Sequence, residues 1–160
     1  VTASATATRS WYAQVRSMFG KPHVSLMSES HDSVPAADHP SHSVAALLGT
    51  IPTLRFVKPA GLRALAETTT HQQVQVGEAV TRQGEHSDAV FLIIDGTFEV
   101  LISHVGHTPD FIRILKTGDS FGELGVLYDV PRTATIRCAS PGHLLRIPGD
   151  AFLDSLETGS

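Results

Sequence analysis

The segment FGELGVLYDVPRTAT, residues Phe121 to Thr135, carries the most informative pattern in this chain. Glu123 and Arg132 stand nine positions apart in a run that is mostly apolar or glycine. The planar guanidinium of an arginine matches the oxygens of a phosphate, whereas an ionised glutamate only accepts hydrogen bonds and suits hydroxyl groups. The two charges therefore indicate either a site for a sugar phosphate or a surface ion pair without function.

The residues between these charges predict a short helix that starts at Gly122. Leu124 and Leu127 are spaced for one helix face. The first N–H groups of a helix have no partner within it, and they suit an anion. Because Gly122 and Gly125 have no side chains, a ligand could approach the backbone closely.

Short strands separated by turns surround this segment. We expect them within residues 72–77, 79–84, 89–103, 111–119, 133–140 and 143–149. The Asp95-Gly96 pair is the strongest hairpin signal of the chain, and it divides residues 89–103 into two strands. A series of short strands with turns between them indicates an antiparallel sandwich or barrel.

Helical patterns flank the strands. Two short helices are expected between residues 43 and 70, the first with an apolar stripe ended by Pro52 and the second starting near Pro59. The inward residues would be Val44, Leu47, Leu48, Ile51, Leu62 and Leu65. Residues 150–157 close the chain as a helix with Asp150 as its N-cap. The predicted fold is α+β and mainly β: an antiparallel, jelly-roll-like β-roll flanked by N-terminal helices and a C-terminal helix.

Residues 1–42 differ in composition from residues 43–160, so we interpret them as an N-terminal extension of the domain. The stretch SESHDSVPAADHPSHS has linker composition. Residues 10–19 place five apolar residues on one face of a helix: Trp11, Tyr12, Val15, Met18 and Phe19. This helix either packs on its own domain or forms a junction with another domain or subunit, as in a homodimer.

Composition excludes several classes. The hydrophobic content of 41% and charged content of 18% are those of a globular domain. The net charge of -4 argues against a nucleic-acid partner. The sequence has no apolar run of membrane-spanning length and no signal-peptide pattern at its start, and Cys138 is its only cysteine. We therefore expect a cytoplasmic protein, or the cytosolic part of a larger one, with Cys138 as a buried thiol.

The segment Phe121 to Thr135 resembles the phosphate-binding cassette of the cyclic-nucleotide-binding domain family. The family pattern is F-G-E-L-A/G, a short gap, and R-T/S/A-A. The family includes catabolite activator protein, regulatory subunits of cAMP-dependent protein kinase and cyclic-nucleotide-gated channels. Upstream, VGEAVTRQGEHSDAVFLIIDGTFEV is similar to the family's strands, with Gly77, Gly84 and Gly96 where its turns fall. The resemblance covers roughly residues 44–158.

The resemblance implies a ligand, cAMP or cGMP, and a role for each matched residue. Glu123 would accept the ribose 2′-hydroxyl, and Arg132 would pair with the cyclic phosphate. The backbone around Gly122 to Gly125 and at Thr133 would complete the anion site, in a segment that also includes Phe121, Leu124 and Ala134. A threonine at position 133 occurs in binders of both nucleotides, and cAMP is slightly favoured. The family also implies regulation of an attached effector. From the residues themselves we expect no catalysis, no cofactor and no metal.

The sequence departs from the family at its C-terminal end. Family members usually have a further helix that covers the base, and this chain stops at LETGS. Either residues 1–160 are a fragment of a larger protein, or Trp11 or Tyr12 covers the base instead.

Other functions remain as alternatives. A cupin-like metal enzyme would need clustered ligands, and His104 and His107 have no carboxylate downstream at ligand spacing. A transcription factor would need a DNA-binding helix-turn-helix, and none follows the strands. A degenerate domain that lost its ligand and binds proteins is the main alternative, and intact Glu123 and Arg132 argue against it.

Overall fold

The protein is described by a computed structural model that places residues 40–158. The helix expected at residues 10–19 lies outside the described residues. No helix within residues 40–158 has the length and apolar character needed to cross a bilayer.

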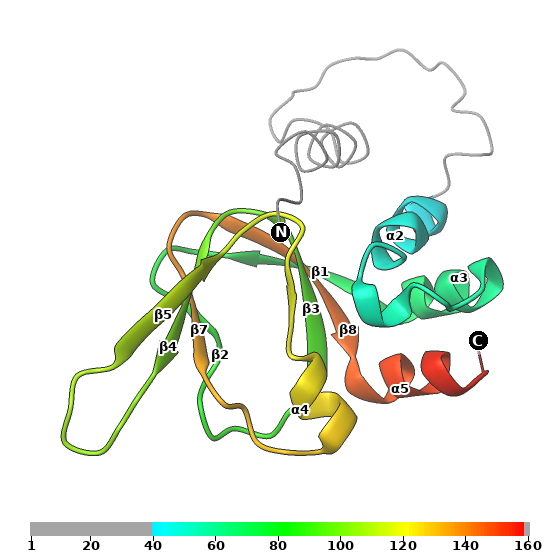
Figure 1. Ribbon diagram of the computed structural model, residues 1–160. Coiled ribbons are helices and arrows are strands. Elements are labelled where there is room, and N and C mark those ends of the chain that lie inside the picture. The colour runs from blue at the N-terminus through cyan, green and yellow to red at the C-terminus, as the bar shows by residue number, and fades with distance from the viewer. Residues whose placement is uncertain (1–39, 159–160) are drawn as a thin grey trace, which may run out of the picture.

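Two four-stranded antiparallel sheets form a β-roll within the described part of the chain (Figure 1). The first sheet has the order β1 (Thr70–Val74), β8 (Gly142–Pro148), β3 (Ala89–Asp95) and β6 (Ser120–Phe121). The second has the order β2 (Ala79–Thr81), β7 (Thr135–Cys138), β4 (Phe98–Ile102) and β5 (Asp110–Leu115). The predicted antiparallel β-roll is confirmed.

The interior of the roll is filled by apolar side chains from both sheets. Phe91 and Ile93 of β3 meet Phe98 of β4, and all three are almost fully buried. Cys138 belongs to the same cluster, where its Sγ lies 2.9 Å from the Ser140 carbonyl oxygen. Burial raises the pKa of the Cys138 thiol. The cysteine is thus a core residue, as its place in a strand pattern predicted.

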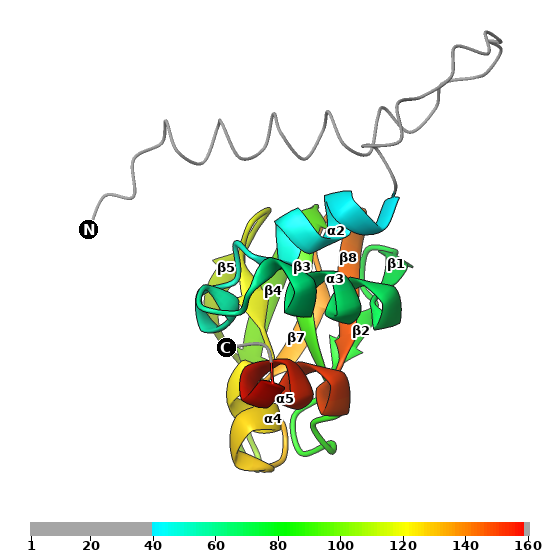
Figure 2. The same ribbon diagram turned by 90° about the vertical axis from the view of Figure 1, so that its right-hand side faces the viewer.

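Helices cover the outer face of the first sheet (Figure 2). They are α2 (Pro40–Leu48), the 3-10 turn η2 (Pro52–Leu54), α3 (Pro59–Thr68) and α5 (Gly149–Thr158). Five of the six residues expected to point inward are buried here: Val44, Leu47, Leu48, Ile51 and Leu65. The sixth, Leu62, is half-buried. Side chains of β3 alternate between this cluster and the roll interior, so one strand serves both cores.

The turn at Asp95-Gly96 does not form a hairpin, and that prediction is wrong. β3 pairs with β8 and β6, whereas β4 pairs with β5 and β7. Six consecutive residues of β3 are buried, because this strand lies in the middle of its sheet and pairs with a neighbouring strand along each of its edges. The turn instead passes the chain from one sheet to the other. It packs so tightly that a Cβ at Gly96 would lie 2.7 Å from the Gly142 Cα.

The start of α5 also differs from the prediction. The helix begins at Gly149, so Asp150 lies in its first turn rather than at the N-cap. The Gly149 N–H donates to the Asp88 carbonyl oxygen at 2.8 Å, and this bond fixes where the helix begins. A carboxylate in the first turn still stabilises the helix through its dipole.

We predict that Phe152→Ala lowers the free energy of unfolding by about 3–5 kcal/mol, because the ring is fully buried between α5 and the first sheet. The matched control is Phe111→Ala on β5, where the ring is exposed and the change should stay within about 0.5 kcal/mol. Urea denaturation measures both. Equal losses for the two variants would contradict the assignment of the core.

Candidate functional site

The segment from Phe121 to Thr135 lies at one end of the roll, where α4 (Glu123–Tyr128) joins β6 to the loop before β7 (Figure 1). Phe121 of β6 is buried and pairs with Phe91 of β3. Their rings stack with centroids 5.0 Å apart. This contact anchors the start of the segment to the central strand.

Gly122 precedes α4 and adopts a backbone conformation that other residues avoid. Its φ is 95°, in the left-handed region, and it is the N-cap of α4, so the helix begins one residue later than predicted. A Cβ here would lie 2.7 Å from the Arg132 Nη1 and 2.9 Å from the Ala89 carbonyl oxygen. Position 122 must therefore be glycine for the Arg132 guanidinium to lie where it does.

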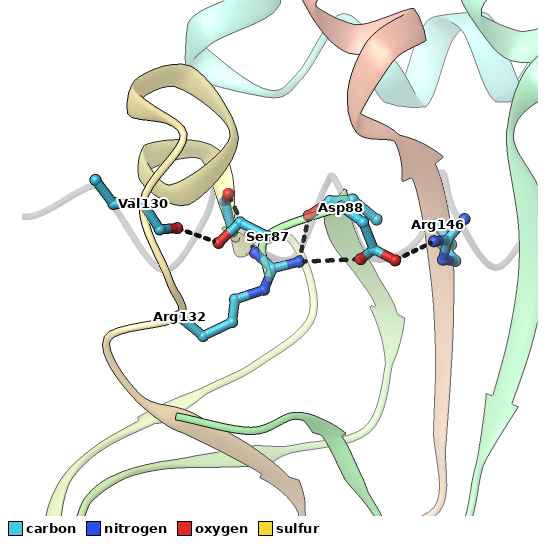
Figure 3. Close-up of polar contacts among 7 residues, drawn as sticks. Ser87, Asp88, Val130, Arg132 and Arg146 are labelled. Atoms are coloured by element: carbon cyan, nitrogen blue, oxygen red, sulfur yellow. Dashed lines mark hydrogen bonds and ion pairs between the residues drawn. The ribbon is translucent and has the colours of Figure 1, made fainter. Parts of the chain in front are cut away.

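Arg132 is the buried charge of this site, with a side chain only 6% exposed. Its Nη2 donates to the Ala89 carbonyl oxygen at 2.7 Å, and its Nη1 donates to the Gly122 carbonyl oxygen at 3.3 Å. These bonds use two of the five N–H donors of the guanidinium. The nearest carboxylate oxygen, on Asp88, lies 3.7 Å from Nη2 and belongs to a mostly exposed side chain (Figure 3).

Asp88 lies between two arginines. Its second carboxylate oxygen is 3.3 Å from the Nη2 of Arg146 on β8, so the carboxylate bridges Arg146 and Arg132 (Figure 3). The backbone of Asp88 accepts the hydrogen bond from Gly149 at the start of α5. Asp88 therefore contacts the Arg132 guanidinium, strand β8 and the C-terminal helix.

Hydrogen bonds hold the loop of Arg132 against the loop that precedes β3. The Arg132 N–H donates to the Glu85 carbonyl oxygen, and the Gly84 N–H donates to the Arg132 carbonyl oxygen, both at 2.8 Å. The Ser87 hydroxyl donates to the Val130 carbonyl oxygen at 2.7 Å (Figure 3). Gly125 packs directly on Ser87, where a Cβ would clash with the hydroxyl. The backbone of the arginine is thus fixed before any ligand arrives.

Electrostatics at Arg132 favour an anion. Burial lowers the pKa of its guanidinium from the ordinary value, while the charge of Asp88 raises it. Arginine stays charged in spite of such burial. A buried cation that has only carbonyl oxygens and one distant, exposed carboxylate as partners is incompletely neutralised. A phosphate beside it would supply the missing negative charge.

The alternative of a Glu123–Arg132 ion pair is wrong. Among the ion pairs of residues 40–158, none joins these two side chains. Glu123 is half-buried at the first position of α4, and its charge only weakly raises the pKa of Arg132. Glu123 and Arg132 lie at the two ends of one segment, and their charges do not neutralise each other.

The other predicted site residues differ in exposure. Thr133 is exposed, Ala134 and Gly125 are half-buried, and Leu124 is 68% exposed. The Leu124 side chain is therefore directed to solvent, and only its backbone could belong to an anion site. Three residues around the Arg132 loop were missed: Asp88 and Ala89, which contact the guanidinium, and Ser87, whose hydroxyl donates to the Val130 carbonyl oxygen. They lie over 40 residues upstream, and the only signal was a polar loop, RQGEHSD, directly before a buried strand.

A metal site finds no support in the described part of the chain. Residues 40–158 contain no group of three or more His, Cys, Asp or Glu side chains placed to hold an ion. His104 instead lies 3.2 Å from Asp110 across the β4–β5 loop, and both side chains are exposed. That contact is a surface pair, and it joins one of the two loop histidines to a carboxylate that the sequence pattern did not single out.

Comparison with known proteins gives the family. Residues 71–158 match the sequence model of the cyclic nucleotide-binding domain. The chain belongs to the cyclic nucleotide-binding domain family. The match includes the strands of the roll, the cassette with Glu123 and Arg132, and α5.

Curated relatives carry this domain as a small part of a longer chain. The protein is 30% identical over 86 residues to an uncharacterized ABC transporter ATP-binding protein of Mycobacterium tuberculosis, covering 54% of this chain and 26% of the relative. It is 26% identical over 146 residues to the potassium channel GORK of Arabidopsis thaliana, covering 84% of this chain and 18% of the channel. The chain therefore spans about a quarter or less of these relatives.

Solved structures share the fold at low identity. The sensor domain of the transcriptional regulator DNR from Pseudomonas aeruginosa superposes with a TM-score of 0.68 at 22% identity, covering 74% of this chain and 80% of that one. The regulatory domain of Toxoplasma gondii PKA with cAMP gives a TM-score of 0.67 at 20% identity, covering 72% and 45%. These likenesses support the β-roll of this cyclic nucleotide-binding domain.

We predict that Gly122→Ala destabilises the domain more than Gly106→Ala. Both glycines have positive φ, so both variants carry the left-handed backbone cost of about 1–2 kcal/mol. Only at position 122 does the new Cβ meet Arg132 and Ala89, because Gly106 has no neighbour within 4 Å. Urea denaturation compares the two variants. Equal destabilisation would mean that Arg132 does not pack against this glycine.

Proposed function

We propose that this domain binds a cyclic nucleotide through the Arg132 guanidinium. The observation that carries the proposal is the incompletely neutralised charge of Arg132, buried within the matched family segment. The guanidinium keeps N–H donors beyond those given to Ala89 and Gly122, and these pair with the exocyclic oxygens of a cyclic phosphate. The phosphate replaces the weak counter-charge of Asp88.

The remaining cassette residues recognise the sugar and complete the site. Glu123 accepts the ribose 2′-hydroxyl, because it is half-buried and has no ion pair with Arg132. The backbone from Gly122 to Gly125 and at Thr133 faces the phosphate, with Phe121 and Ala134 as supporting residues. Such a site prefers a cyclic nucleotide to a linear one. The phosphate of a linear 5′-nucleotide carries a second negative charge, which the carboxylate of Glu123 would repel.

The proposed ligand is cAMP in preference to cGMP. The support for cAMP is that it is the ligand named for two structural neighbours, the Toxoplasma gondii PKA domain and PfPKA-R. Thr133 is exposed, so its hydroxyl is available to a guanine in the syn conformation, and this residue does not itself favour adenine.

The proposed role is regulation without catalysis in this domain, in the cytosol. In the two relatives the matching part is 26% and 18% of the chain, which fits a sensor attached to an effector. A ligand shifts such an effector only by its different affinity for the two states. Asp88 connects Arg132 with β8 and the start of α5, so a phosphate that takes over Arg132 changes the contacts of the C-terminal helix.

We predict that Arg132→Ala weakens cyclic nucleotide binding by about 2–5 kcal/mol, because the phosphate loses its charge partner. Glu123→Ala should cost less, because it removes one hydroxyl contact and also a carboxylate near the phosphate. Isothermal titration calorimetry with cAMP measures both. The matched control is Arg137→Ala on β7, whose guanidinium pairs with Glu99 away from the cassette.

Folding must be separated from binding in this test, since Arg132→Ala also removes one hydrogen-bond donor from each of the Ala89 and Gly122 carbonyl oxygens. The Gly122 carbonyl oxygen keeps the Val126 N–H as a donor. Arg132→Lys keeps the positive charge and three N–H donors but loses the planar fork that pairs with two phosphate oxygens, so it should bind more weakly than wild type but better than Arg132→Ala. Urea denaturation shows that each variant is folded. Unchanged affinity in a folded Arg132→Ala would refute Arg132 as the phosphate partner, whereas no binding by the wild-type chain would favour a domain that has lost its ligand.

We predict that Thr133→Ala lowers the affinity for cGMP while leaving that for cAMP within a factor of about two. One lost hydrogen bond to guanine corresponds to about 0.5–1.5 kcal/mol. Calorimetric titration of wild type and variant with both nucleotides gives the ratio. An equal loss for both ligands would show that Thr133 acts on the phosphate instead of the base.

A further inference from the structure

An exposed apolar face lies beside the cassette, on α4. Leu124, Leu127 and Tyr128 follow one another at helix spacing, and Val126 points the other way into the core. Leu124 and Tyr128 are 68% and 71% exposed. Large apolar side chains gathered on one face at such exposure indicate a surface that another segment covers.

The neighbouring helix α5 gives this face an acidic border. α4 and α5 are in contact, and both views show them side by side (Figures 1 and 2). The exposed face of α5 contains Asp150, Leu153, Asp154 and Glu157, which share one side of the helix by their spacing. Asp129 follows α4, and neither helix contains a lysine or arginine. We call the exposed residues of α4 and α5 together the α4–α5 face.

The first part of the sequence has the complementary chemistry. Residues 1–28 contain Arg9, Arg16 and Lys21 but no aspartate or glutamate. The stripe of Trp11, Val15, Met18 and Phe19 recurs at the spacing of a helix face. An amphipathic, basic segment matches an apolar surface with an acidic border.

The connection is long enough for this segment to reach the α4–α5 face. Residues 22–39 separate it from the start of α2, and 18 residues span at most roughly 60 Å when extended. A domain of this size has a radius of gyration of only roughly 14 Å. The α4–α5 face is therefore within reach of the same chain.

The other large exposed apolar group has the wrong charge. Phe111, Ile112 and Ile114 of the edge strand β5 are also exposed, but Arg113 lies among them and Lys116 follows, so the strand region is net positive in spite of Asp110 at its start. A segment with three basic residues and no acidic one is not attracted to that strand. The two surfaces thus differ in sign, and β5 provides a control.

We propose that residues 9–21 dock on the α4–α5 face of the same chain, with the Trp11 stripe on Leu127 and Tyr128 and the basic residues beside Asp154 and Glu157. The docked segment covers the solvent side of the cassette helix. The proposal does not depend on cyclic nucleotide binding, and it is tested without ligand.

Trp11 is the only tryptophan of the chain, so its fluorescence reports directly on the segment. In the full chain we expect emission at short wavelength and slow quenching by acrylamide. Leu127→Ser/Tyr128→Ser should shift the emission to longer wavelength and increase quenching. The matched control Phe111→Ser/Ile112→Ser on β5 should change neither. Wild-type Trp11 that is already fully quenchable, or an α4 variant that matches the control, would overturn the proposal.

Reversing the charges on the two surfaces gives a second, independent test of the docking. Asp154→Lys/Glu157→Lys should expose Trp11, and Arg16→Glu should do the same. Combining the three substitutions should restore the short-wavelength emission, because the attraction is rebuilt with opposite signs. Glu67→Lys on the exposed side of α3 is the control for net charge. Failure of the combined variant to recover, while circular dichroism shows a folded chain, would count against docking at this face.

Two further outcomes identify a different occupant. Dilution should leave the Trp11 emission unchanged if the segment docks on its own chain. Emission that shifts to longer wavelength on dilution, together with a dimer in sedimentation, would overturn the proposal in favour of a second copy. High salt should weaken the docking, since screening at 1 M reduces the Debye length to about 3 Å, and an increase in Trp11 burial with salt would contradict the charge argument.

Discussion

The position of the Arg132 guanidinium is the constraint on which the rest of the site depends. A charge this deeply buried must find polar partners, and here the Ala89 and Gly122 carbonyl oxygens provide them. The first carbonyl belongs to the central strand and the second to the turn before α4. That turn needs glycine, because a side chain would occupy the place of the guanidinium. The cassette and the strand are thereby locked together around one cation.

This arrangement links the cassette to the helical layer. Asp88 contacts Arg132 with its side chain, pairs with Arg146 on β8, and accepts the first N–H of α5 with its backbone. β3, which Asp88 immediately precedes, packs into the roll with one face and against the helices with the other. A new charge partner for Arg132 would therefore act on residues shared by the site and the C-terminal helix. Such a shared element is what a regulatory domain needs to transmit binding.

Much of the architecture was predictable because the relevant signals are local. Alternation and turn glycines marked the strands, and the stripe from Val44 to Ile51 marked the first buried helix. Strand pairing was not predictable in the same way. Asp95-Gly96 has hairpin chemistry, yet the burial of β3 on both faces sends β4 to the other sheet. Local residue preferences determine where the chain turns. Which strands then pair depends on how the whole fold buries its apolar surface.

The candidate site shows the same division. Glu123 and Arg132 could be selected from one short segment, since their residue types and spacing are visible there. The roles of Ser87, Asp88 and Ala89 could not, because only the fold brings these residues against Arg132 or the loop that carries it. Leu124 shows the opposite limit: its pattern suggested a packed helix face, and its side chain lies in solvent.

The most direct test of the central claim is calorimetric titration of the wild-type chain with cAMP and with 5′-AMP. We predict saturable binding of cAMP and much weaker or undetectable binding of 5′-AMP, since the site proposed around Arg132 and Glu123 would select a singly charged cyclic phosphate. Equal binding of both nucleotides, or no binding of cAMP at millimolar concentration, would contradict it.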